Sequence, residues 1–278
     1  VNTGKIINLD NESDIQIYDG NDGNANPGEE IELSIPLRNF GTQTVNGIQA
    51  YLETTSDLVD ITIPIVEYGT LTPGSSSVGE GFSLTLGGSI INEEDLQLRL
   101  IITDDSESEW NGIVSVNVAA PNLIVSNVNI ESGSISPGET KDMSIVLSNK
   151  GSISSEEISA TLSSGSFLIS VLDSEGSWNS IDPGNSSVSE EDFTIHASGD
   201  IINGTIFPLS LNIETMNGYN RTETVHIQIG EVSASDPLGP DEYGYYIYDS
   251  WDTGYEMAPS YEWIEIESIG TNLDIYDL

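Results

Sequence analysis

The chain contains no cysteine and few basic residues, and each shortage excludes a class of function. Because cysteine is absent from all 278 residues, no disulfide supports the fold and no thiol chemistry is available. Six Lys and Arg stand against 46 Asp and Glu, which gives a net charge of −40 at pH 7. Such a chain repels nucleic-acid phosphates and anionic lipid headgroups. We therefore predict no nucleic-acid partner. The chain also has no run of about 18 apolar residues, so we predict no membrane insertion.

The signatures of common enzyme chemistry are also missing. The sequence contains no HExxH or CxxC zinc motif, no G-x-S-x-G elbow and no glycine-rich phosphate loop with a lysine. Its two histidines, His196 and His226, both lie in strand-like runs, where a histidine is usually a residue of a sheet face. No carboxylate pair suited to glycoside hydrolysis stands out among the 46 acids. We therefore predict that the chain is not an enzyme.

The chain does contain many short runs in which apolar and polar residues alternate. Hydrophobic residues make up 37% of it, which favours an ordered chain over a disordered polyanion. Runs with a period of two, separated by Gly, Pro, Asn and Asp, occur at 32–39, 47–53, 60–68, 82–86, 96–103 and 113–118. No segment keeps a 3.6-residue period over three turns. The sequence therefore predicts an all-β fold.

An internal repeat divides most of the chain into two copies. Three pairs of segments are offset by 110 residues: 27–29 with 137–139, 31–41 with 141–151, and 71–78 with 181–188. A fourth pair, 81–92 with 192–203, follows at an offset of 111. The size and strand pattern of each copy are those of an immunoglobulin-like β-sandwich. We predict two tandem immunoglobulin-like β-sandwiches at 1–120 and 121–232, followed by an aromatic, acidic C-terminal extension at 233–278.

The repeat also predicts matching core and turn positions. Leu33, Ile35 and Leu37 are expected to be buried, together with their counterparts Met143, Ile145 and Leu147. An Asn-x-Gly tripeptide ends this strand in each copy, at 39–41 and at 149–151. We expect its glycine to adopt a positive φ.

The extension at 233–278, hereafter the tail, carries eleven acidic residues, no base, and nine of the 20 aromatic residues. Tyr and Trp bury large areas when they meet a surface, so the tail is expected to be ordered. It either packs against the second sandwich or anchors a partner subunit. The candidate partner-binding residues are Tyr245, Tyr246, Tyr248, Trp251 and Trp263.

The segment DGNDGNANPGEE (19–30) is a candidate calcium loop. Calcium prefers six to eight oxygen ligands from carboxylates, amides and backbone carbonyls. The candidate ligands are Asp19, Asn21, Asp22, Asn24, Asn26 and Glu30. The loop is not an EF-hand, because Asn24 stands where an EF-hand needs glycine and no helices flank it. The second copy keeps the Pro-Gly-Glu turn but lacks the extra oxygens, and a solvated hairpin loop is the alternative. A second candidate metal group is Asp236, Asp241, Asp249 and Asp252.

Four Asn-x-Ser/Thr sequons provide glycosylation candidates, at Asn11, Asn185, Asn203 and Asn220. The absence of cysteine, together with abundant Ser, Thr, Asn and Gly, is typical of an exported bacterial or archaeal surface protein. We therefore expect an extracellular or cell-surface location.

Two blocks carry a family resemblance. Residues 239–266, GPDEYGYYIYDSWDTGYEMAPSYEWIEI, resemble a connecting segment of large secreted bacterial surface proteins. Residues 19–41 resemble the opening of the immunoglobulin-like modules repeated in those proteins, which include gingipain-like peptidases and relatives exported with a C-terminal sorting domain. The resemblance implies an extracellular, non-catalytic region. The catalytic Cys and His of the peptidases do not carry over, since this chain has no cysteine.

Three functions remain as expectations. The leading one is a structural protein of a cell-surface stalk or filament that self-associates, or joins neighbouring domains, through the tail or a terminal strand at 5–10 or 273–278. The second is an accessory spacer region of a secreted gingipain-like peptidase. The third is a carbohydrate-binding module whose stacking platform is drawn from Trp110, Trp178, Trp251 and Trp263.

Overall fold

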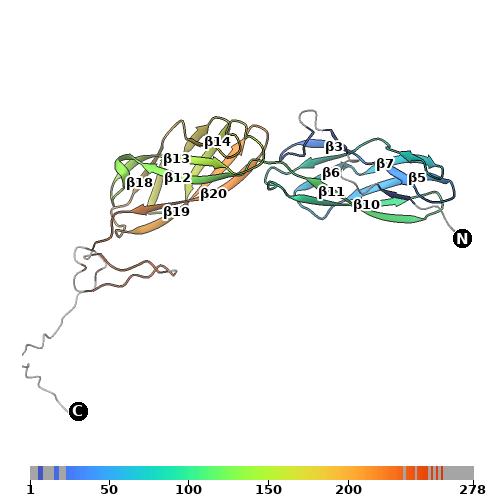
Figure 1. The fold of residues 1–278 in the computed structure, drawn as a ribbon. Coiled ribbons are helices and arrows are strands. Elements are labelled where there is room, and N and C mark those ends of the chain that lie inside the picture. Colours follow the sequence, from blue (N-terminus) through green and yellow to red (C-terminus); the bar gives the residue numbers. More distant parts are fainter. Residues whose placement is uncertain are drawn as a thin grey trace, which may run out of the picture.

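The computed structural model describes residues 6–8, 16–18, 23–233, 236–241 and 243–249, together with Asp252, Tyr255 and Ala258. In this part the chain is all-β, with one 3-10 turn, η2 (Glu131–Gly133), and no α-helix. Accordingly, none of the described residues forms a helix long and apolar enough to cross a membrane. The strands form two tandem immunoglobulin-like β-sandwiches, arranged one after the other (Figure 1).

The first sandwich packs one four-stranded antiparallel sheet against a layer made of a second four-stranded sheet and a three-stranded sheet. The first of these sheets has the order β11 (Glu109–Asn117), β10 (Asp95–Thr103), β5 (Val45–Glu53) and β7 (Ile65–Leu71). One sheet of the facing layer has the order β2 (Gln16–Tyr18), β3 (Glu30–Ser34), β9 (Phe82–Leu86) and β6 (Val59–Ile63). The other has the order β1 (Ile6–Asn8), β4 (Leu37–Asn39) and β8 (Ser76–Ser77).

The second sandwich repeats this arrangement with fewer interruptions. One sheet has the order β12 (Leu123–Ile130), β13 (Thr140–Asn149), β18 (Phe193–Ala197) and β15 (Ile169–Asp173), and β17 (Ser186–Val188) also pairs with β13. The other has the order β16 (Glu175–Trp178), β14 (Ile158–Ser164), β19 (Thr205–Thr215) and β20 (Asn220–Ile229). Burial along β19 alternates strictly, as expected for a strand with one face in the core.

Two runs that the sequence predicts as single strands are in fact broken, so these predictions are wrong in detail. The run at 32–39 is divided between β3 and β4, and the run at 60–68 between β6 and β7. Pro36 and Pro64 lie at the breaks, and proline has no N–H to donate to a sheet. In the second copy β13 continues past the equivalent of Pro36, whereas β15 and β16 still separate at Ser174. The second break therefore belongs to the topology, because β6 and β7 pair in different sheets.

Each sandwich encloses its own hydrophobic core. The first core cluster draws on residues from Ala25 to Ala120, and the second on residues from Leu123 to Ile229. The predicted core residues are confirmed, since all six are at most 1% exposed (Leu33, Ile35, Leu37, Met143, Ile145, Leu147).

A buried aromatic side chain is anchored at the same place in both cores. The Tyr68 hydroxyl donates to the carbonyl of Ile35 over 2.7 Å, and Trp178 Nε1 donates to the carbonyl of Ile145 over 3.1 Å. The two aromatic residues and the two carbonyls are each separated by 110 residues in the chain. A large apolar ring thus spans each core while its polar atom is satisfied by the facing sheet.

The Asn-x-Gly turns owe their shape to the asparagine. Asn39 and Asn149 are both 0% exposed. Each Nδ2 donates to two backbone carbonyls at 2.8–2.9 Å, and each Oδ1 accepts from the glycine two residues later at 2.8–2.9 Å. The predicted positive φ is wrong, because neither Gly41 nor Gly151 adopts one. Glycine at 151 instead avoids a collision, since a Cβ there would lie 2.2 Å from the Ala120 carbonyl oxygen.

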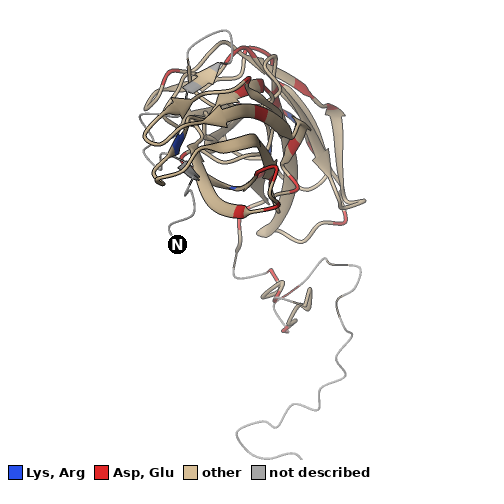
Figure 2. Cartoon of the chain, turned by 90° about the vertical axis from the view of Figure 1, so that its right-hand side faces the viewer, with Lys and Arg blue, Asp and Glu red and all other residues tan. Residues whose placement is uncertain are grey.

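Acidic residues are spread over loops and strands, whereas Lys and Arg are few (Figure 2). Two ion pairs occur among the residues that the structure describes: Arg99 with Glu53 at 2.7 Å, and Arg221 with Glu223 at 2.6 Å. The first is exposed and contributes little to stability. The second lies where the two sandwiches meet.

Candidate functional site

The two sandwiches meet through three glycines. Gly28 belongs to the Pro-Gly-Glu turn of the first sandwich, and Gly88 to the loop that follows β9. Both lie against the hairpin at 215–219 that joins β19 to β20. A Cβ on Gly28 would lie 2.3 Å from the Asn217 carbonyl oxygen, and one on Gly88 would lie 1.9 Å from the Gly218 carbonyl oxygen. Only glycine permits this backbone-to-backbone approach.

Hydrogen bonds on both sides of the junction join the first sandwich to the hairpin, the linker and a loop of the second sandwich. The Asn220 N–H donates to the Gly88 carbonyl over 2.9 Å. On the other side of the junction, the Asn92 Oδ1 accepts from the Ala120 N–H over 2.9 Å and from the Ser152 hydroxyl over 2.5 Å. One asparagine of the first sandwich therefore binds both the linker and a loop of the second.

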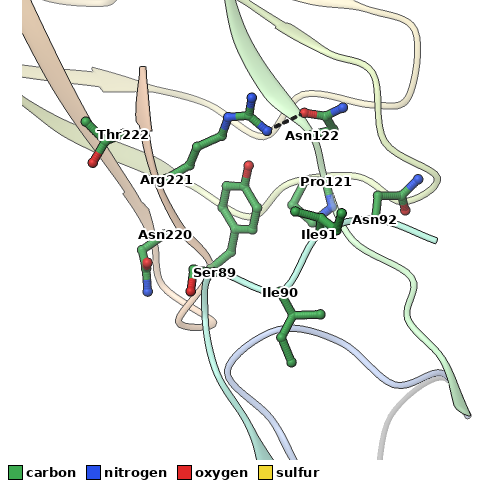
Figure 3. A pocket seen from close by; sticks show the side chains of 10 residues that line it. Ser89, Ile90, Ile91, Asn92, Pro121, Asn122, Asn220, Arg221 and Thr222 are labelled. Atoms are coloured by element: carbon green, nitrogen blue, oxygen red, sulfur yellow. Dashed lines mark hydrogen bonds between the residues drawn. The ribbon is translucent and has the colours of Figure 1, made fainter. Parts of the chain in front are cut away.

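A cavity of about 500 Å³ lies between these contacts (Figure 3). Arg221 and Asn122 both line it, and Arg221 Nη1 donates to Asn122 Oδ1 over 2.7 Å. Arg221 Nε donates to Glu223 Oε1 over 2.6 Å. The Tyr219 hydroxyl accepts from the Leu123 N–H over 3.3 Å. The cavity is lined by Ser89, Ile90, Ile91, Asn92, Pro121, Asn122, Tyr219, Asn220, Arg221 and Thr222.

The ionisable groups of this cavity are in the protonation states that hydrogen bonding between the linker and β20 requires. Burial lowers the pKa of Arg221, but the hydrogen bond and the charge of Glu223 outweigh burial and raise the pKa overall. Burial raises the pKa of the Tyr219 hydroxyl, so this group stays neutral at physiological pH. Arg221 thus remains charged while its donors are directed at Asn122 and Glu223, which fixes the linker against β20.

The candidate calcium loop is only partly described. Asp19, Asn21 and Asp22 lie outside the described residues. Of the others, Asn24 is exposed, Asn26 is buried beside the Pro-Gly-Glu turn, and Glu30 on β3 accepts from the Ser83 hydroxyl over 3.0 Å. No group of three or more Asp, Glu or His side chains arranged to hold a metal occurs among the described residues. Calcium binding therefore stays a prediction.

The side chains of the second candidate metal group make local hydrogen bonds. Asp236 accepts from the Ser233 N–H over 2.6 Å and from the Tyr255 hydroxyl. Asp241 Oδ1 accepts from two N–H groups of the following turn, each over 2.9 Å, and Asp252 accepts from the Asp249 N–H over 2.5 Å. These bonds shape the tail, and metal binding by the group stays a prediction.

The tail contacts the end of the second sandwich that lies away from the first (Figure 1). Tyr246 hydrogen-bonds through its hydroxyl to Thr205, and Tyr248 packs edge-on against Tyr255 with ring centroids 6.4 Å apart. Tyr245 is 71% exposed. Of the five candidate partner-binding residues, Tyr246 thus contacts the sandwich and Tyr245 is accessible, while Trp251 and Trp263 lie outside the described residues.

The sequons occupy different surroundings. Asn185 is exposed on a turn, and Asn220 is exposed beside the junction. Asn203 is half-buried, and its Nδ2 donates to Asp236 over 3.4 Å. Asn11 lies outside the described residues.

Of the residues expected to form a stacking platform or a terminal strand, those that the structure describes pack within their own sandwich. Trp178 is 1% exposed and offers no open ring face for a sugar, and Trp110 packs partly buried against the first core. Residues 6–8 form β1 and pair with β4 of their own sandwich. The segment 273–278 lies outside the described residues.

No protein-family model and no curated protein matches the sequence. Among solved structures, a red sea bream transglutaminase is similar over 78% of this chain and 31% of its own, at 8% identity and a TM-score of 0.33. A protein of unknown function from Porphyromonas gingivalis W83 is similar over 78% of this chain and 100% of its own, at 12% identity and a TM-score of 0.22. This chain thus spans under a third of the transglutaminase, and both scores are too low to support an argument about function.

Proposed function

We propose that the chain is a non-catalytic structural protein of a cell-surface stalk or filament, in which the sandwich pair serves as a rigid extracellular spacer. The observation that carries this proposal is the glycine junction. A flexible tether between two modules needs no close packing, whereas here the backbones of Gly28, Gly88 and Gly218 are in direct contact. Such contacts favour a defined orientation of the two sandwiches.

The tail is the element proposed to link subunits. It lies at the end of the molecule opposite the first sandwich, and its exposed aromatic residues Tyr243 and Tyr245 are 76% and 71% exposed. Aromatic side chains are enriched in protein–protein interfaces because they bury large areas at low entropic cost. Since β1 is already paired with β4, the tail is preferred over the N-terminal strand as the linking element.

Electron microscopy of the concentrated protein tests this proposal. We expect end-to-end particles from the full chain and single two-module rods after removal of residues 233–278. The proposal fails if the shortened chain assembles as the full chain does, or if the full chain stays a single rod at every concentration.

The spacer region of a secreted peptidase is the second candidate, and the same rigid junction favours it. A spacer holds its neighbours apart without polymerising, so it predicts single rods for both the full and the shortened chain. Association measured by sedimentation of the full chain therefore separates the two functions.

A further inference from the structure

The second sandwich carries its own copy of the surface with which the first sandwich binds its neighbour. In the first sandwich this surface is the first glycine socket, defined by Gly28 and Gly88. The repeat places Gly138 and Gly199 at the equivalent positions, which we call the second glycine socket. It lies at the end of the second sandwich away from the junction.

The backbone frames of the two sockets match closely. Gly28 and Gly138 have φ values of 82° and 81°. Their N–H groups donate to the carbonyls of Leu86 and Ala197, over 3.0 and 2.9 Å. The following loops begin with equivalent bonds, from the Gly87 N–H to Leu58 over 2.7 Å and from the Ser198 N–H to Leu168 over 2.9 Å.

The sockets differ in what covers them. The first is filled by the hairpin at 215–219. In the second, a Cβ on Gly138 would find only the Gly199 Cα, at 3.8 Å, and a Cβ on Gly199 would meet no described atom within 4 Å. Gly199 also lacks a positive φ, so its own sandwich does not require glycine there. Glycine at its counterpart Gly88 is required only by the neighbouring module.

We propose that the second glycine socket binds the uncharged, glycine-tipped β-hairpin of another β-sandwich module, as the first socket binds Asn217-Gly218. This inference rests on the proposed structural role, since both treat the sandwich pair as one part of a longer assembly. It adds the identity of the partner surface: a tight turn whose left-handed residue is glycine, approaching backbone to backbone.

The hairpin at the free end of the first sandwich does not meet this requirement. Residues 104–108 form the same turn as 215–219, with the Glu107 N–H bonded to the Asp104 carbonyl over 3.0 Å and the Gly218 N–H bonded to Thr215 over 3.0 Å. Glu107, with φ 59°, occupies the place of Gly218. A Cβ on Gly218 would already lie 3.2 Å from Gly28, so a glutamate side chain fits poorly.

Charge also disfavours the hairpin at 104–108 as the occupant of the second glycine socket. The hairpin at 104–108 has the sequence DDSES with three carboxylates, whereas 215–219 reads TMNGY with none. Exposed Glu139 and Asp200 flank the second socket. Like charges brought together across an interface suppress the wrong pairing, so an unaltered second copy is disfavoured as the occupant.

The test converts the acidic hairpin into the glycine-tipped one in the full chain. The variant D104T/D105M/S106N/E107G/S108Y should associate head to tail, giving about a twofold or greater rise in weight-average mass over wild type in sedimentation, because each hairpin fills the next copy's socket. Adding Gly199→Phe, whose Cβ would meet no described atom within 4 Å, should return the mass to the wild-type value. Circular dichroism and melting confirm that each variant is folded.

Three results would overturn the proposal: a folded hairpin variant with the mass of wild type, association that survives Gly199→Phe, or association that requires removal of residues 233–278, which would make the tail the occupant. If the five-residue variant does not fold, S106N/E107G decides by the same criteria, since it keeps Asp104 and Asp105. The mass of wild type measured in the same run is the baseline. Failure of the wild-type chain to associate would therefore count against the proposed function alone, and not against binding at the second glycine socket.

Discussion

A single methyl group at residue 88 should uncouple the two sandwiches. In Gly88→Ala, the new Cβ would lie 1.9 Å from the Gly218 carbonyl oxygen and 2.3 Å from Asn220 Nδ2. Such contacts are essentially never closer than 3.0 Å, so the hairpin must retreat by about 1 Å. Because Gly88 lacks a positive φ, alanine there does not strain the first sandwich itself.

The cost can be worked from the contacts that change. Overpacking a closely packed site costs about 1–3 kcal/mol. Loss of the 2.9 Å hydrogen bond from Asn220 to Gly88 adds about 1 kcal/mol. We therefore expect the junction to lose about 2–4 kcal/mol while each sandwich, with its own core, stays folded.

Residual dipolar couplings measured by NMR provide the assay. In wild type both sandwiches should fit one alignment tensor, and in Gly88→Ala they should need two. Gly199→Ala is the matched control, because it occupies the equivalent position and meets no described atom within 4 Å. A single shared tensor for Gly88→Ala, with wild-type values, would refute the reasoning.

Three further outcomes are expected. Asn149→Ala should lower the free energy of unfolding of the second sandwich, measured by urea titration, by about 3 kcal/mol, because buried backbone groups lose their hydrogen-bond partners. Asn129→Ala, at an exposed position, is the control and should change this free energy by under about 0.5 kcal/mol. Burial raises the pKa of Asp236, but hydrogen bonds from Tyr255, Ser233 and Asn203 outweigh burial and lower it. The contribution of Asp236 to the tail contact is therefore complete above the ordinary pKa of 3.8 and is lost as the pH falls through the lowered pKa. The NMR signals of Tyr255 should report this loss, and Asp236→Asn should remove the pH dependence. If the loop at 19–30 binds calcium, a chelator should lower the melting midpoint of the first sandwich, and an unchanged midpoint counts against the site.

The sequence predicts the fold class well because a strand with one face buried in a sandwich alternates apolar and polar residues with a period of two. Leu33, Ile35 and Leu37 alternate with polar residues, and the second copy repeats the pattern 110 residues later. The interruptions were harder to predict. Pro36 and Pro64 mark two breaks, but Ser174 shows that a strand can change sheets without proline.

The junction could not be predicted from the sequence, because its residues are chosen by contacts between distant segments. Gly28, Gly88 and Gly218 resemble ordinary turn glycines, and two of them do have a positive φ. Only their mutual approach distinguishes them. One signal was present: Gly88 and Gly199 both remain glycine in aligned loops, although neither has a positive φ that requires it.

The path of the chain through the second sandwich has a mechanical consequence. The chain enters at Leu123, beside the junction, and leaves at Ile229, at the opposite end. A pull along the molecule would therefore act parallel to β12, whose hydrogen bonds to β13 run perpendicular to the strand. Such bonds are sheared together and do not open one after another, so the module should resist tension better than a sandwich pulled from one end.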